Sequence, residues 1–276
     1  MKFGELIKYL DEVFPKNLSA SWDSDGVEVC VDYNLEIGRI LTVLDITFDV
    51  VDFAVANGYN CILSHHALFF KPVKKIDLSD SATKKAVRMI KHGICAASFH
   101  TRLDSVDGGV NDCFLKALNI NENSKIEQFY EPGETASVGR IVELEEECDL
   151  IDFIEDIKKA FKRYYKTELD IDQNAGISYI KGDRDVKKIG AVSGGGMDFA
   201  EIAAKMGADT FITGEGKYNR TLEAYESLDK GSRLNIITMG HFETEIVVLP
   251  FMKHKILEKF PNAVVDCFTG EYNNLM

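Results

Sequence analysis

Several signatures that would place a chain in a specialised class are missing from this sequence. Its 276 residues contain no low-complexity tract and no long linker rich in proline, glycine or serine. No apolar run reaches about 18 residues, so we expect no membrane span. The N-terminal segment alternates charged and apolar residues and lacks the unbroken apolar core of a signal peptide. We therefore expect a cytoplasmic protein.

Paired cysteines and net positive charge are also missing. The six cysteines form no C-x-x-C pair, which argues against a zinc ribbon or a disulfide framework, and we assign none of them chemistry. The 45 acidic and 32 basic residues give a formal net charge of −13. Such a surface repels phosphate backbones, so nucleic acid is a poor partner. We interpret the best basic cluster, Lys158–Lys159 with Lys162–Arg163, as the solvated face of an amphipathic helix.

The sequence does contain a regular alternation of strand and helix patterns. With 45% hydrophobic residues it can bury a substantial core. Strands separated by helices of about ten residues are typical of βαβ units and a largely parallel sheet. We expect helices at 2–14, 47–57, 81–91, 109–118, 150–165, 199–206, 220–227 and 244–260, and strands at 26–31, 39–45, 60–64, 94–99, 138–144, 188–193, 209–213, 234–239 and 263–266.

The alternation of strands and helices is interrupted in the middle of the chain and then resumes. The pattern predicts an α/β fold made of two similar lobes with mostly parallel sheets. We assign residues 1–127 and 236–276 to the first lobe and residues 128–235 to the second.

Histidine is rare in the chain, and its placement is informative. Of the six histidines, four fall just after a predicted strand, namely His65, His66, His100 and His241. Parallel α/β sheets bind ligands outside the carboxyl ends of their strands, so these side chains indicate a functional site. A single histidine at a strand end is more often a surface or hydrogen-bonded residue. The adjacent pair strengthens the functional interpretation, because an exposed double histidine has no packing purpose.

Two carboxylates accompany these histidines. Asp104 shares a strand-end loop with His100, and Glu245 follows His241 at i+4, which places both side chains on one face of a helix. Imidazole and carboxylate together suit zinc, iron, manganese or nickel. One metal takes at most three or four protein ligands. Three histidines and two acids are better explained by two divalent ions bridged by carboxylate and water, in the cleft between the lobes.

Two alternatives concern the ligand set itself. His100 is either a ligand or a group that orients Asp104. Glu243 can replace Glu245, but it points about 200° around a helix from His241, so we prefer Glu245.

Two further segments have open roles. The glycine-rich run Ser193–Gly196 links a strand to a helix, where it either cradles a phosphate with backbone N–H groups or forms a tight turn. Glu215 and Lys217 follow another strand, and they either face the same crevice or belong to a structural turn.

Six segments, taken in order, resemble one known family, the Nif-three-like dinuclear-metal proteins described as GTP cyclohydrolase I type 2 homologs. Their sequences in this chain are W-D-S-D-G-V, L-D-I-T, S-H-H-A-L-F-F, H-T-R-L-D, G-G-V-N-D and G-H-F-E-T-E, at residues 22–27, 44–47, 64–70, 100–104, 108–112 and 240–245. Each motif is modest evidence alone, but six in the correct order are strong evidence.

The resemblance implies a toroidal homohexamer in which each chain has the compact form without an inserted domain. It implies that the acids bridge two metal ions and that the ligands are His65, His66, Asp104, His241 and Glu245. Two residues depart from the pattern. Asn219 stands where the family usually has a histidine and cannot transfer protons near neutral pH. Ala67 replaces the usual proline, which should affect only loop stiffness.

Two functions from different classes fit these features. The first is a metal-dependent hydrolase acting on a small nucleotide or phosphoester-type molecule, with GTP cyclohydrolase-like activity implied by the resemblance. His100 and Glu215 are then candidates for assisting proton transfer, but we assign no catalytic residue. The second is a non-enzymatic metal-binding or regulatory ring protein. A structural site closes its shell with protein atoms, whereas five protein ligands for two ions leave room for water, which favours catalysis.

Overall fold

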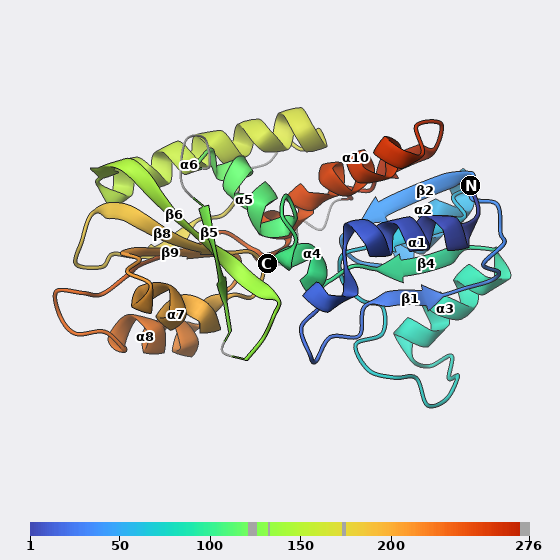
Figure 1. Ribbon diagram of the computed structural model, residues 1–276, viewed down its shortest axis with the longest axis horizontal. Helices are drawn as coiled ribbons and strands as arrows, with labels where there is room; N and C mark the ends of the chain where they lie inside the picture. The colour runs from blue at the N-terminus through green and yellow to red at the C-terminus, as the bar shows by residue number, and fades with distance from the viewer. Residues whose placement is uncertain (121–125, 132, 173–174, 271–276) are drawn as a thin grey trace. The chain divides into compact units, whose positions relative to one another are not determined.

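The computed structural model of the chain describes residues 1–120, 126–131, 133–172 and 175–270, and it divides into two compact units (Figure 1). The first unit comprises Met1–Leu103 and Leu249–Met276, and the second comprises Asp104–Val248. None of the helices in the described ranges combines the length and the apolar character that crossing a bilayer requires.

The first unit is built on a five-stranded sheet with the strand order β1-β4-β3-β2-β11. All neighbouring strands are parallel except β1, which runs antiparallel to β4. Both β3 and β4 are buried at every residue, as expected for parallel strands at the centre of a sheet. The strands are β1 (Gly26–Val29), β2 (Arg39–Val43), β3 (Cys61–Ser64), β4 (Cys95–Ser98) and β11 (Val264–Cys267).

Helices α2 and α3 contact each other and share one hydrophobic core with strands β2, β3 and β4. Helix α1 packs against α10, and α10 lies against β2 and β11. The sequence explains the ends of α2, because the Thr47 side chain accepts a hydrogen bond from Val50 N and Gly58 adopts the left-handed conformation. The helices of this unit are α1 (Phe3–Val13), α2 (Phe48–Asn57), α3 (Ser81–Lys91) and α10 (Leu249–Lys259), and α4 (Thr101–Ser105) crosses the boundary between units.

The second unit is built on a six-stranded sheet with the strand order β5-β6-β8-β9-β10-β7. Strands β8, β9 and β10 are parallel, and the remaining pairs are antiparallel. The parallel strands therefore end at one edge of the sheet, and the loops that follow them meet there. The strands are β5 (Ile126–Tyr130), β6 (Ser137–Cys148), β7 (Ser178–Ile180), β8 (Val186–Val192), β9 (Thr210–Thr213) and β10 (Asn235–Thr238).

Helices α5 and α6 lie on one face of this sheet, and α7 and α8 lie on the other (Figure 1). Helix α6 buries an apolar stripe that includes Phe153, Ile157 and Phe161, and it exposes Lys158 and Lys159. The basic cluster is therefore the solvated face that the sequence predicted. The helices of this unit are α5 (Val110–Leu118), α6 (Leu150–Tyr164), α7 (Ala200–Lys205), α8 (Tyr218–Glu226) and α9 (His241–Glu245).

The α/β architecture is confirmed, but the unit boundaries differ from the expected ones. Helix α5 contacts α6, β6 and β8, and β10 pairs with β9 and β7, so both elements belong to the second unit. The single helix expected at 244–260 is divided into α9, a 3₁₀ turn at Ile246–Val248, and α10. Pro250 lies in the first turn of α10, where its missing N–H and fixed φ favour the start of a new helix.

Candidate metal centre

Three histidines gather at the carboxyl ends of β3 and β4 in the first unit. His65 and His66 directly follow β3, and His100 lies two residues beyond β4. One ring nitrogen from each lies within 4.8 Å of those of the other two. His65 is fully buried, and the other two are partly buried. The first unit alone therefore presents a group of imidazoles that can hold a metal ion.

The orientation of the His65 and His66 rings is set by oxygen atoms on their Nδ1 sides. His65 Nδ1 lies 3.1 Å from the carbonyl oxygen of Phe99, and His66 Nδ1 lies 2.9 Å from Asp45 Oδ1. A carbonyl and an ionised carboxylate can only accept, so each ring donates from Nδ1. The remaining nitrogen, Nε2, is then the atom that can coordinate a metal ion, and this arrangement is typical of metal-bound histidine.

His100 is held in the same way by Asp23. Its Nδ1 lies 3.1 Å from Asp23 Oδ2, and that oxygen also accepts from the backbone N and the hydroxyl of Thr101. Burial alone would raise the pKa of Asp23, but the hydrogen bonds from His100 and Thr101 outweigh it and hold this pKa well below its usual value. Asp23 therefore stays ionised and keeps the His100 ring in place.

The second unit supplies a histidine and a carboxylate from α9, which follows β10. His241 Nε2 lies 3.2 Å from Glu245 Oε2, one helical turn later. On its other side, His241 Nδ1 lies 3.1 Å from Glu215 Oε2, which comes from the loop after β9. Glu215 thus relates to His241 as Asp45 relates to His66, and Nε2 of His241 is directed to the side of Glu245.

The glycine-rich run after β8 packs directly against this pair. Gly194 has φ +59°, and a Cβ added there would overlap Glu245 Oε1 and lie 3.1 Å from His241 Nε2. Its N–H donates to Thr244 Oγ1 at 2.9 Å, and its carbonyl accepts from Glu215 N at 2.7 Å. The glycine is required because three strand-end loops meet there. This packing explains the run without a bound phosphate, so we favour the tight-turn interpretation.

Asp104 lies in the last turn of α4 and is tied to the glycine-rich run through one buried side chain. Asn111 Nδ2 donates to the carbonyl of Asp104 at 3.0 Å, and Asn111 Oδ1 accepts from Ser193 N at 3.0 Å. Asn111 is only 1% exposed. It therefore fixes the backbone that carries Asp104 relative to the loop beside Glu245.

The remaining candidates lie in different surroundings. Glu243 turns its backbone carbonyl to the hydroxyl of Tyr165, and burial raises the pKa of its carboxyl group. Lys217 and Asn219 are exposed at the start of α8. The sequence prediction named none of Asp23, Asp45 and Asn111, although all three lie within the motifs that carry the family resemblance. The available signal was their position inside these motifs, each of which also contains another polar residue.

Comparison with known proteins decides the family. The Duf34/NIF3 (NGG1p interacting factor 3) family matches residues 1–274. The chain belongs to this family. Two relatives named GTP cyclohydrolase 1 type 2 homolog support the assignment. The protein from Clostridium perfringens is 32% identical over 96% of this chain and 94% of its own length, and that from Clostridium acetobutylicum is 30% identical over 93% and 90%.

Solved structures of low sequence identity share the fold of this Duf34/NIF3 chain. A Bacillus cereus protein related to NIF3 aligns with a TM-score of 0.80 at 20% identity, covering 100% of this chain and 99% of its own. Staphylococcus aureus protein SA1388 aligns with a TM-score of 0.79 at 24% identity, and the alignment covers 100% of this chain and 99% of that protein's chain. These likenesses confirm the α/β fold.

Substituting Gly194 with alanine tests the close packing beside Glu245. We expect Gly194→Ala to lower the free energy of unfolding by about 2–3 kcal/mol, from left-handed strain plus overlap with the carboxylate. Gly58→Ala is the matched control, because Gly58 has φ +71° with open space around its Cβ position. It should cost only about 1 kcal/mol. Urea unfolding measures both, and equal losses would contradict the packing argument.

Proposed function

We propose that this Duf34/NIF3 protein is a metal-dependent hydrolase acting on a nucleotide or phosphoester substrate. It would bind two divalent ions through His65, His66, Asp104, His241 and Glu245. The observation that carries the proposal is the hydrogen bonding shared by three histidines, each within its own unit. Each has an oxygen atom at Nδ1, from Phe99, Asp45 and Glu215 respectively, and each thereby directs Nε2 for coordination.

The donor set fits divalent transition metals. Neutral imidazole and carboxylate suit zinc, iron, manganese and nickel better than magnesium or calcium, which prefer oxygen ligands. Bound ions of this kind act as Lewis acids and activate water for attack. The carboxylates of Asp104 and Glu245 would offset the repulsion between two cations. Five protein ligands leave positions for water and substrate, which favours catalysis over a closed structural site.

The protein supplies candidate groups for proton transfer beside these ligands. Glu215 is half exposed and hydrogen-bonded to His241, so its carboxylate can take a proton from a group bound at the site. His100 faces Asp23, which can stabilise the imidazole in its charged form. Asn219 can offer hydrogen bonds but no proton transfer near neutral pH. The names of the clostridial relatives make GTP the first substrate to test.

Metal removal tests this function directly. Freshly purified protein should contain two transition-metal ions per chain by elemental analysis. Chelation should abolish hydrolysis in a screen of GTP and phosphate esters, and adding back zinc, iron, manganese or nickel should restore it, whereas magnesium should not. Hydrolysis that survives complete metal removal would contradict the proposal. Full metal content without turnover of any tested substrate would favour the regulatory function instead.

A further inference from the structure

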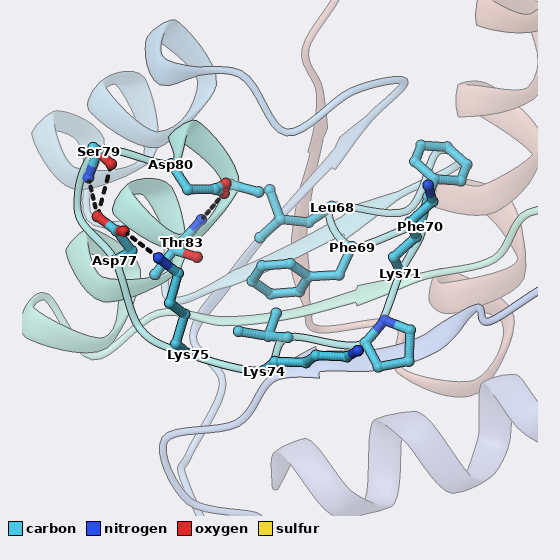
Figure 2. A pocket seen from close by; sticks show the side chains of 13 residues that line it. Leu68, Phe69, Phe70, Lys71, Lys74, Lys75, Asp77, Ser79, Asp80 and Thr83 are labelled. Carbon is cyan, nitrogen blue, oxygen red and sulfur yellow. Dashed lines mark hydrogen bonds and ion pairs between the residues drawn. The ribbon is translucent and has the colours of Figure 1, made fainter.

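The segment between β3 and α3 forms an open pocket whose volume is about 680 Å³ (Figure 2). The pocket belongs entirely to the first unit and is lined by residues between Leu68 and Thr83. Three of the lining residues are lysines, at positions 71, 74 and 75. They stand out because the whole chain carries a formal charge of −13. The pocket is thus a local positive feature on an acidic protein.

Charge is divided between the two ends of this pocket. At one end, Asp77 bonds to Ser79 and pairs with Lys75 at 3.0 Å, and Asp80 caps helix α3 through Thr83 N. Lys71 lies at the other end, beside Phe70, and Lys74 lies between Lys75 and that end (Figure 2). Within the described part of the chain, neither of these two lysines has an acidic partner. They are therefore available for an external anion.

Two exposed aromatic rings contact His100, and one of them, Phe70, also lines this pocket. The Phe70 ring centroid is 5.8 Å from that of His100, and the Trp22 centroid is 6.0 Å away. These rings are 59% and 64% exposed, so core packing does not account for them. Their segments are tied together, because Ser24 Oγ donates to the carbonyl of Phe69 at 3.3 Å.

We infer that Trp22, Phe70, Lys71 and Lys74 form a substrate subsite for a nucleoside phosphate. Trp22 and Phe70 contact the base, since stacking on an aromatic ring contributes about 1–3 kcal/mol per base. Lys71 and Lys74 bind the phosphate groups as mobile point charges. A neutral sugar would leave the lysines unused, and inorganic phosphate would leave the rings unused. This inference rests on the proposed function, because it names the substrate class of the same site.

The chain offers a built-in probe for this subsite. Trp22 is its only tryptophan, so intrinsic fluorescence excited near the red edge reports on the subsite alone. Titrating the metal-loaded protein with GTP and, separately, with guanosine should change this fluorescence in both cases. GTP should bind more tightly than guanosine. The affinity for GTP should fall as the salt concentration rises, whereas the affinity for guanosine should not.

Three variants separate the two halves of the subsite. Lys71→Ala/Lys74→Ala should weaken GTP binding about tenfold and leave guanosine binding unchanged, as expected for two exposed charge contacts. Phe70→Leu should weaken both ligands about tenfold. Lys158→Ala/Lys159→Ala removes the same charge from the exposed face of α6 and should change neither affinity.

Each outcome supports or overturns the subsite independently of catalysis. The predicted pattern of affinities without any turnover would retain the subsite and reject the hydrolase. Turnover of GTP with unchanged binding in the lysine and Phe70 variants would retain the hydrolase and overturn the subsite. The absence of any fluorescence change with either ligand at millimolar concentration would overturn it as well.

Discussion

Replacing His66 with alanine is expected to remove at least one metal ion while the chain stays folded. Losing a group that merely orients a ligand typically weakens metal binding by about 10–100-fold, so losing a ligand should cost more than 100-fold. The fold should tolerate the change, because the His66 backbone keeps its bonds to Leu44 and to the Ser64 hydroxyl. The unfolding free energy of the metal-free protein should change by less than about 1 kcal/mol.

The His66→Ala experiment has a matched control in the same chain. His254 lies on α10 with 71% of its side chain exposed, and it pairs with Glu258 at the surface. His254→Ala removes the same chemical group without touching the candidate centre. Elemental analysis after gel filtration, together with urea unfolding of chelated samples, measures both effects. Full metal occupancy in the His66→Ala protein would reject the ligand assignment.

Much of the fold could be predicted because segments with helical or strand periodicity are bounded by capping and turn residues along the chain. Helix α3 begins and ends where the sequence predicted, at Ser81 and Lys91, because Asp80 caps it and Gly93 follows it in a left-handed conformation. Strands β5 and β7 were not predicted. The three residues of β7, Ser178–Ile180, are held by pairing with β10 rather than by an apolar pattern. Pairing with a neighbouring strand in the folded sheet, rather than the local sequence pattern, determines that this segment is a strand.

The ligand candidates were accessible from sequence, but the groups that orient them were not. A histidine at a strand end can be recognised from the sequence, because the hydrophobic pattern of a strand shows where the strand ends. Its hydrogen-bond partner is chosen by topology. Asp45 lies 21 residues before His66, Asp23 lies 77 residues before His100, and Glu215 lies 26 residues before His241. No local spacing rule links these pairs, and only the folded sheets bring them together.

A buried arginine in the second unit is another residue whose contacts could not be predicted from the local sequence. Arg140 lies on β6 with a side chain only 1% exposed, and nothing in its local pattern predicts burial. It binds both carboxylate oxygens of Asp112, at 2.8 and 3.1 Å. It also donates to the carbonyls of Ser105 and Val106, at 3.2 and 3.3 Å. These carbonyls follow Asp104 directly, so Arg140 supports the segment that carries a predicted ligand.

Replacing Arg140 with methionine should therefore destabilise the chain by about 3 kcal/mol or more. The methionine keeps most of the volume but leaves Asp112 as a largely buried charge without its partner and removes the donor from two carbonyls. Adding Asp112→Asn to Arg140→Met should recover part of the loss, because it removes the uncompensated charge. Arg220→Met is the control, since Arg220 makes its ion pairs with Asp198 and Glu223 at the surface and should matter little.

Urea unfolding and metal content together show whether Arg140 only stabilises the second unit or also positions the Asp104 segment for metal binding. If Arg140 only stabilises the second unit, Arg140→Met protein kept well below its unfolding midpoint should bind metal as tightly as the unmodified chain. If it also holds the Asp104 segment in place, metal affinity should fall by about tenfold or more even in fully folded protein. The hydrogen bonds to Ser105 and Val106 favour the second result, because they act on the backbone immediately after the ligand. Equal stability of the Arg140→Met and Arg220→Met proteins would contradict both roles.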